Sequence, residues 1–241
     1  AHRFVMLGFD EEQGEVYVGD RTDEETQTCS MEAIRLSRNP PVGISTYNLW
    51  GRFNSGEVRN SLPDACGLAL RKTVERMQGT DASQLELMRT AQGNSGSVIG
   101  AGLHVLWSFR EQMREWPGRD NAAAHAQYVD SAIVKFGTGG AFFRKHFHGF
   151  LQWASVQRPD LVSPAEVELA GRAMDAWDAL APTMKALTEM PGDAALWNLA
   201  GEQVEGIYQL EHSLFGRLAD TVLAEPGTGS IPATPAGGVK G

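Results

Sequence analysis

The amino-acid sequence predicts an α+β protein that is mainly α, with a β-hairpin at the start of the chain and a helical bundle after it. The first 21 residues hold two short runs of β-forming side chains around an acidic turn. From residue 63 onward, apolar side chains recur instead at the spacing of amphipathic helices. We therefore expect a hairpin-containing domain over residues 1–60, a helical domain over 61–223 and a disordered tail over 224–241.

The hairpin is predicted from three consecutive segments. Residues 4–7, Phe-Val-Met-Leu, form an unbroken apolar run, which is typical of a strand that is covered on both faces. Residues 10–14 are polar and end in glycine, as a longer hairpin loop does. Residues 15–18 alternate polar and β-forming side chains and would form the returning strand.

The pairing of these strands leads to a functional hypothesis. If Asp10 pairs with Gly14, His2 lies opposite or diagonal to Asp20 on the same face, with backbones roughly 5 to 8 Å apart. A carboxylate there would fix the tautomer of the imidazole, as the orienting group of a nucleophile–base–orienter triad does. One extra residue in the ladder would place the two groups on opposite faces. The alternative is a surface histidine and an aspartate that begins a loop.

Composition and charge exclude several classes of partner. The net charge is −9 and no basic run is present, which argues against nucleic acid or an anionic membrane surface. No apolar stretch approaches the roughly 20 residues that cross a bilayer, and no signal peptide is visible. The two cysteines, Cys29 and Cys66, suit a reducing compartment, so we expect a cytoplasmic protein.

After the hairpin, residues 22–30 are expected to be a linker and Met31 to Arg38 a short helix, stopped by two prolines. Residues 42–60 should be an extended connection. The helices expected in the helical domain cover 63–78, 83–90, 98–116 and 122–135, followed by one from Phe143, one from Pro164 and one after Asp193. Cys66 lies on the apolar stripe of the first of these and is expected in the core.

A glycine-rich segment precedes the helix predicted from Phe143. Gly137, Thr138, Gly139 and Gly140 would offer backbone N–H groups at a positive helix end, with Arg144 about one turn later. This chemistry suits an anion such as the phosphate of a phosphopantetheine arm. The alternative is a tight turn that lets two helices pack closely, with Arg144 bonded to a buried carboxylate.

No metal site is expected from the histidines. His146 and His148 are two residues apart on one helix, so their side chains point in different directions. Glu202, Glu205 and Glu211 are expected on a solvated face. The alternative for Glu211, which lies next to the inward-facing Leu210, is a semi-buried position.

Two segments resemble a known family. The segment from His2 to Asp10, together with Val-Tyr-Val-Gly-Asp ending at Asp20, resembles the histidine and aspartate strands of papain-like cysteine enzymes. The variant is that of the double-glycine leader peptidases and the butirosin biosynthesis protein H family. Residues 134–144, followed by Phe150, Leu151 and Trp177, resemble the helical domain that follows the papain-like domain in the butirosin protein H family.

This resemblance implies a cysteine acyltransferase that passes an acyl group from a carrier-protein thioester to an amine of a natural-product intermediate, as in antibiotic biosynthesis. It implies His2 as base and acid, Asp20 as its orienting group, and Gly137 to Gly140 with Arg144 as substrate-binding residues. The partners would be an acyl carrier protein and a small-molecule amine. The phosphopantetheine-bound acyl donor would be a substrate, and no cofactor or metal would be needed.

In that family the nucleophilic cysteine lies upstream of the histidine. We therefore expect this chain to be the C-terminal, truncated part of such an enzyme, inactive alone, and neither Cys29 nor Cys66 to be the nucleophile. Two alternatives stay open, a non-catalytic helical interaction module and a leader-peptidase-like cysteine protease. The sequence leaves open whether the protein is a monomer or a homo-oligomer.

Overall fold

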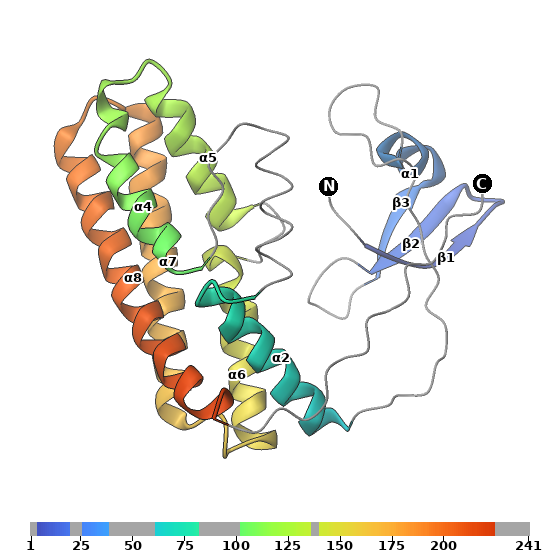
Figure 1. Cartoon of the computed structure of the whole chain (residues 1–241). Helices are drawn as coiled ribbons and strands as arrows, with labels where there is room; N and C mark the ends of the chain where they lie inside the picture. Colours follow the sequence, from blue (N-terminus) through green and yellow to red (C-terminus); the bar gives the residue numbers. More distant parts are fainter. Residues whose placement is uncertain (1–3, 20–25, 39–60, 82–101, 136–139, 225–241) are drawn as a thin grey trace. The chain divides into compact units, whose positions relative to one another are not determined.

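A computed structural model describes residues 4–19, 26–38, 61–81, 102–135 and 140–224. The chain divides into two compact units, Ala1–Val58 and Arg59–Gly241, called here the N-terminal unit and the helical unit (Figure 1). The described residues form a small antiparallel sheet and seven α-helices, which confirms the α+β, mainly α fold. The predictions for residues 42–60, 83–90 and 225–241 lie outside the described residues.

The sheet of the N-terminal unit contains the strands β1 (Val5–Asp10), β2 (Glu15–Gly19) and β3 (Gln27–Ser30), in the order β1-β2-β3. The hairpin prediction is therefore confirmed for β1 and β2. The linker prediction is wrong for β3, which pairs antiparallel with β2. Its polar sequence, Gln-Thr-Cys-Ser, gives no alternating apolar signal, because its position is set by backbone pairing with a neighbouring strand. Helix α1 (Met31–Arg38) follows directly, as predicted.

The hairpin turn is one residue longer than the expected pairing gives. If Asp10 paired with Gly14, about three residues would make the turn, whereas Asp10 pairs with Glu15 and four residues make it. The carboxylate of Asp10 accepts hydrogen bonds from the backbone N–H groups of Glu12 and Gln13, at 2.9 and 3.0 Å. Gly14 has a φ of 67°, in the left-handed region that glycine adopts without strain. The expected register is therefore wrong beside the turn.

A β-bulge then changes the register along the hairpin. The ladder shifts by one residue between Met6 and Gly8, so that Met6 lies opposite Val18. That pair is the one which the expected register gives at this position. The bulge thus offsets the extra turn residue in the part of the hairpin that leads toward the N-terminus.

The apolar side chains at the start of the hairpin are exposed. The side chains of β2 that face the core, Val16 and Val18, are only 4 % and 7 % exposed. By contrast, five side chains on or beside β1 are 39 to 59 % exposed: Phe4, Val5, Met6, Leu7 and Phe9. Consecutive strand residues alternate between faces, so both faces of β1 are uncovered in the described structure. The expectation of a strand covered on both faces is not met within this chain.

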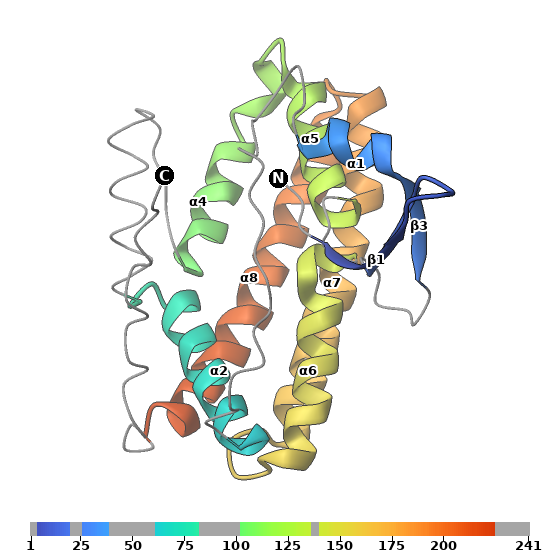
Figure 2. The same cartoon turned by 90° about the vertical axis from the view of Figure 1, so that its right-hand side faces the viewer.

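The helical unit is a bundle built on two long neighbouring helices. Its elements are α2 (Leu62–Met77), α4 (His104–Met113), η1 (Trp116–Gly118), α5 (Ala122–Val134), η2 (Ala141–Phe143), α6 (Arg144–Gln157), α7 (Pro164–Glu189) and α8 (Ala194–Val222). Helices α7 and α8 run side by side (Figures 1 and 2). Helices α4 and α5 pack on one end of this pair, and α2 and α6 pack on the other.

Two hydrophobic clusters correspond to the two ends of the bundle. One joins α4, η1 and α5 to the end of α7 and the start of α8, around Leu180, Met184 and Ile207. The other joins α2 and α6 to the start of α7 and the end of α8, around Leu70 and Leu214. Cys66 is buried in the second cluster, as its position on the apolar stripe predicts.

Local signals mark the ends of the long helices as expected. The side-chain oxygen of Ser163 accepts a hydrogen bond at the start of α7, and Glu166 completes a capping box. The carboxylate of Asp193 accepts hydrogen bonds from Ala195 and Leu196 at the start of α8. Pro182 lies inside α7, which continues to Glu189.

The capping residue Glu166 leads to a prediction about pH. Glu166 is 7 % exposed, and its carboxylate accepts hydrogen bonds from Ser163 N (2.8 Å) and from Arg217 Nε (2.6 Å). Burial alone would raise the pKa of Glu166, but the hydrogen bonds from Ser163 and Arg217 outweigh burial and hold the pKa below its ordinary value of 4.5. A depressed pKa adds stability above the ordinary value, which is lost as the pH falls through the folded-state value.

We therefore expect Glu166→Gln to lower the melting temperature most above pH 4.5, with a difference from the native protein that shrinks at lower pH. Melting curves measured across this range test the expectation. Glu168→Gln, which changes an exposed carboxylate on the same helix, is the matched control. A difference that grows toward acid pH would contradict the role given to Glu166.

Candidate functional site

The predicted site residues fall partly outside the described structure. His2, Asp20, Gly137, Thr138 and Gly139 lie outside the described residues. Gly140 and Arg144 are described and belong to one short stretch of the helical unit, where η2 leads into α6. The site is therefore built from these two residues outward.

The backbone between Gly140 and Arg144 is strained. Ala141, Phe142 and Phe143 have φ values of 48°, 48° and 69°, and we call these three residues the left-handed run. A left-handed conformation costs a residue other than glycine about 1 to 2 kcal/mol. Such a run persists only where the surrounding structure holds it in place. The prediction that the helix begins at Phe143 is therefore wrong, because α6 begins at Arg144.

Gly140 is favoured by its backbone conformation. Its φ is 93°, and a Cβ atom there would lie 2.7 Å from Nζ of Lys145. Lys145 in turn lies 3.2 Å from a carboxylate oxygen of Asp178 on α7. The last glycine of the predicted substrate-binding segment therefore serves the positive φ of its own turn, whatever else it contacts.

The guanidinium of Arg144 spans the start of α6 and the middle of α8. Its Nε and Nη2 donate to the two carboxylate oxygens of Glu211, at 2.7 and 2.6 Å. Its Nη1 donates to the backbone carbonyl of Phe142 at 2.9 Å. The side chain of Glu211 is 1 % exposed and that of Arg144 is 17 % exposed, so this bidentate pair is largely removed from water.

Trp177 completes the cluster from α7. Its indole Nε1 donates to Glu211 at 2.6 Å. Its ring stacks on that of Phe142, with centroids 5.1 Å apart, and the Arg144 guanidinium lies 5.5 Å from its centroid. Residues from η2, α6, α7 and α8 thus meet at one buried carboxylate. We call Arg144, Trp177 and Glu211 the buried triad.

The triad matches the structural alternative for Arg144, in which the arginine bonds a buried carboxylate. Glu211 is too deeply buried to meet a substrate. Phe143, by contrast, is 49 % exposed, and His146 is exposed one turn into α6. That Arg144 also contacts a ligand stays a prediction.

Neither Glu211 nor Trp177 is predicted from the sequence as a partner of Arg144. The expectation of a solvated face is wrong for Glu211, and burial goes further than its semi-buried alternative, since this residue is fully buried. A signal was present, because Glu211 occupies an apolar position in a repeat of three- and four-residue steps. The buried residues of that stripe in α8 are Val204, Ile207, Glu211, Leu214, Leu218 and Val222.

The cysteines differ in their surroundings. Burial raises the pKa of the Cys66 thiol, which disfavours the thiolate that a nucleophile needs. Cys29 lies in β3 and its Sγ donates to the carbonyl oxygen of Val16 at 3.8 Å. The position of Cys66 agrees with the expectation that it is not the nucleophile, and the same expectation for Cys29 stays a prediction.

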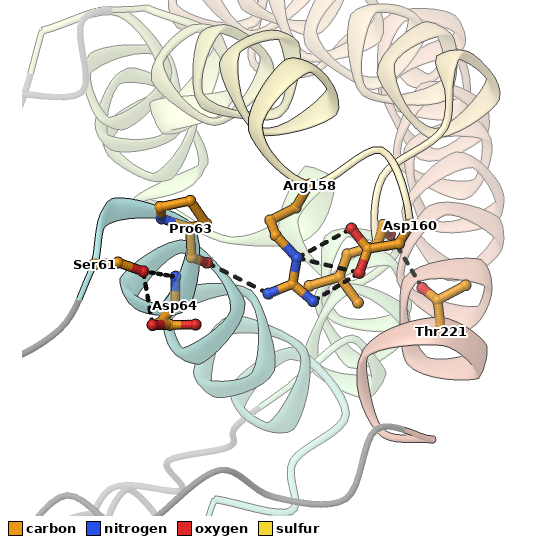
Figure 3. Close-up of polar contacts among 7 residues, drawn as sticks. Ser61, Pro63, Asp64, Arg158, Asp160 and Thr221 are labelled. Carbon is orange, nitrogen blue, oxygen red and sulfur yellow. Dashed lines mark hydrogen bonds and ion pairs between the residues drawn. The ribbon is translucent and has the colours of Figure 1, made fainter.

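A shallow pocket lies where α2 meets the connection between α6 and α7. It has a volume of about 290 Å³ and is lined by Pro63, Asp64, Gly67, Leu68, Arg71, Arg158 and Val222. Figure 3 shows Arg158 bonded to Asp160, through Nε at 3.0 Å and Nη2 at 2.7 Å, and to the carbonyl of Pro63 at 3.4 Å. These contacts join α2 to the rest of the bundle, so we assign the pocket a structural role.

No three His, Cys, Asp or Glu side chains of the described residues are grouped so that they could hold a metal ion. None of the described helices combines the length and the apolar character that a membrane span requires.

Comparison with known proteins places the chain in a family. A family model described as "Domain of unknown function (DUF4872)" matches residues 30–218, which include all of the helical bundle except its last few residues. The chain belongs to the DUF4872 family. No curated protein and no solved structure matches it. The buried triad lies inside the matched region, and the hairpin lies before it.

Proposed function

We propose that this DUF4872 chain is the C-terminal portion of a cysteine-dependent acyltransferase similar to the butirosin biosynthesis protein H family. The enzyme would move an acyl group from a carrier-protein thioester to the amine of a natural-product intermediate. His2 would act as base and acid, with Asp20 as its orienting group. The segment from Gly137 to Gly140, with Arg144, would contribute to binding the acyl donor.

The observation that carries this proposal is the exposed strand β1. An apolar run such as that of β1 is typical of a strand covered on both faces, yet these side chains are 39 to 59 % exposed. Among the described strands, β1 also lies at the edge of the sheet, where a further strand could pair with it. Both features suit a hairpin that belongs to a larger papain-like domain.

The hairpin register supports the same proposal. Met6 lies opposite Val18, and Val5 lies opposite Gly19, at the end of the ladder nearest His2 and Asp20. This is the register assumed by the hypothesis that Asp20 orients His2. The bulge between Met6 and Gly8 therefore does not remove the basis for pairing a histidine with an aspartate on one face.

The proposed chemistry proceeds in two steps. With its proton held by His2, a cysteine thiolate attacks the thioester carbonyl, and the carrier thiolate leaves and takes that proton from His2, which gives an acyl-enzyme and a carrier thiol. The amine then attacks the acyl-enzyme and loses a proton to the neutral His2, and the cysteine leaves as a thiolate, which restores the thiolate–imidazolium pair. Asp20 stabilises the imidazolium during both steps.

The test is acyl transfer by the full-length protein with an acylated carrier protein and an amine, followed by mass spectrometry of the enzyme. We expect a Cys29→Ala, Cys66→Ala double variant to keep both transfer and the acyl-enzyme mass shift. Loss of transfer in either single variant, with an unchanged melting temperature, would identify that cysteine as the nucleophile and contradict this assignment.

A second candidate function is a non-catalytic helical interaction module. The buried triad favours it, since Arg144 and Trp177 both donate their hydrogen bonds to Glu211 inside the bundle. Binding of carrier protein by the full-length protein without any transfer would support the module and exclude the acyltransferase.

A further inference from the structure

We infer that Glu211 and Trp177 are positioning residues, which fix Arg144 and, through it, the left-handed run that begins after Gly140. The inference deepens the proposed function and rests on it in one respect only, namely that the Gly140 end of the run binds the acyl donor. Neither residue is assigned a direct contact with a substrate.

The left-handed run needs support from outside its own sequence. Alanine and phenylalanine do not favour positive φ, and three such residues occur in succession from Ala141 to Phe143. No side chain caps the start of α6, where Phe143 is the N-cap residue. The local sequence therefore gives no reason for the conformation, and the reason must lie in tertiary contacts.

The buried triad holds the left-handed run at its middle residue, Phe142, in two ways. The carbonyl of Phe142 accepts a hydrogen bond from Nη1 of Arg144, at 2.9 Å. The ring of Phe142 stacks on Trp177, with an angle of 25° between the planes. Backbone and side chain of the same residue are thus fixed by two members of the buried triad.

Glu211 orients both Arg144 and Trp177. It accepts both parallel N–H groups of the Arg144 fork and the indole N–H of Trp177. A bidentate pair fixes the plane of the guanidinium as well as its position. With Nε and Nη2 on Glu211, Nη1 is left pointing toward the carbonyl of Phe142. Glu211 acts on the run through these partners, because it is fully buried itself.

The experiment compares two Glu→Gln variants by hydrogen exchange. Glu211→Gln keeps the shape of the side chain but cannot accept from the guanidinium with both terminal atoms. Glu166→Gln removes a similar carboxylate, which lies in the first turn of α7 and is bonded to Arg217 rather than to the buried triad. We expect the amides of residues 141–145 to exchange at least tenfold faster in Glu211→Gln and to be unchanged in Glu166→Gln. Equal effects in both variants, or a uniform rise along all of α6, would overturn the inference.

Trp177→Phe serves as a second variant, for the case in which Glu211→Gln does not fold. It keeps an aromatic ring for stacking on Phe142 and loses the donor to Glu211. Faster exchange confined to residues 141–145 is again the expected result, and unchanged exchange there contradicts the role of the indole N–H.

A kinetic measurement on the full-length protein separates positioning from stability. We expect Glu211→Gln to raise the KM for the acylated carrier protein at least tenfold, at a temperature well below melting, with kcat for a small-molecule thioester unchanged. Transfer with an unchanged KM would overturn the functional part of the inference. If the native protein transfers no acyl group, the proposed function fails, and the exchange experiment still decides whether Glu211 holds the run.

Discussion

Arg144→Ala is expected to lower the free energy of unfolding of the helical unit by about 3 to 5 kcal/mol, which is the typical cost of breaking a buried ion pair by removing one partner. The reason is that Glu211 remains, with a side chain only 1 % exposed, and no other cation is bonded to it among the described residues. The variant also loses the hydrogen bond that holds the carbonyl of Phe142.

Denaturant unfolding of Arg144→Ala measures this loss. The matched control is Arg114→Ala, which breaks an exposed pair with Glu111 on α4, where a loss within about 0.5 kcal/mol is expected. An Arg144→Met, Glu211→Leu double variant should be more stable than Arg144→Ala, since it leaves no buried charge unpaired. A loss below about 1 kcal/mol in Arg144→Ala would contradict the structural role of the triad.

The same variant distinguishes the two hypotheses about Arg144. A charge-assisted bond to a phosphate contributes roughly 1.5 to 3 kcal/mol, so a ligand-binding arginine should, when removed, weaken use of the acylated carrier by one to two orders of magnitude. A purely structural arginine should leave the dependence on donor concentration unchanged while stability falls. The two measurements are independent, so a residue with both roles would change both.

Much of the helical unit could be predicted because its signals are local. The serine and glutamate of the capping box, Ser163 and Glu166, lie three residues apart and bond each other, so the sequence alone contains the whole interaction. The same holds for Asp193 at the start of α8. The apolar stripe of Cys66, Leu70 and Val74 needs only a helical period to be recognised, and all three residues are buried.

The features that escaped prediction depend on distant residues. Strand β3 is set by pairing with β2 rather than by its own polar side chains. The left-handed run is held by Trp177 of α7, which stacks on Phe142, and by Glu211, which lies 67 positions from its partner Arg144. Phe143 fitted an apolar stripe with Phe147 and Leu151, and so it was assigned to the helix, although it is the N-cap residue.

The buried face of α8 is hard to predict because a charged residue, Glu211, lies within its apolar repeat. The spacing of the leucines predicts a buried seam that includes Leu199 and Leu210, but Leu199 is 43 % exposed and Leu210 is only partly buried. The buried stripe instead passes through Trp197, Ala200 and Glu211. A glutamate is assumed to face water unless its partner is known, and its partner here, Arg144, comes from another helix.

The last prediction concerns His2 and needs the full-length protein. We expect His2→Ala to reduce the rate of acyl transfer by about 10² to 10⁴, the usual contribution of a positioned general base. Asp20→Asn should cost less, because the carboxylate only orients the imidazole and stabilises its charge. Under this proposal both variants should keep the melting temperature of the native protein, since the two groups are proposed to act in catalysis rather than in folding.

Initial rates of both variants, measured with the same acylated carrier and amine, test this order. His104→Ala is the matched control, because it removes an exposed histidine at the start of α4 and should leave the rate unchanged. Equal, small losses in His2→Ala and Asp20→Asn would show that the pair has a structural role in the hairpin. A larger loss in Asp20→Asn than in His2→Ala would exchange the two roles, since the group that moves the proton is the one whose removal slows the chemical step most.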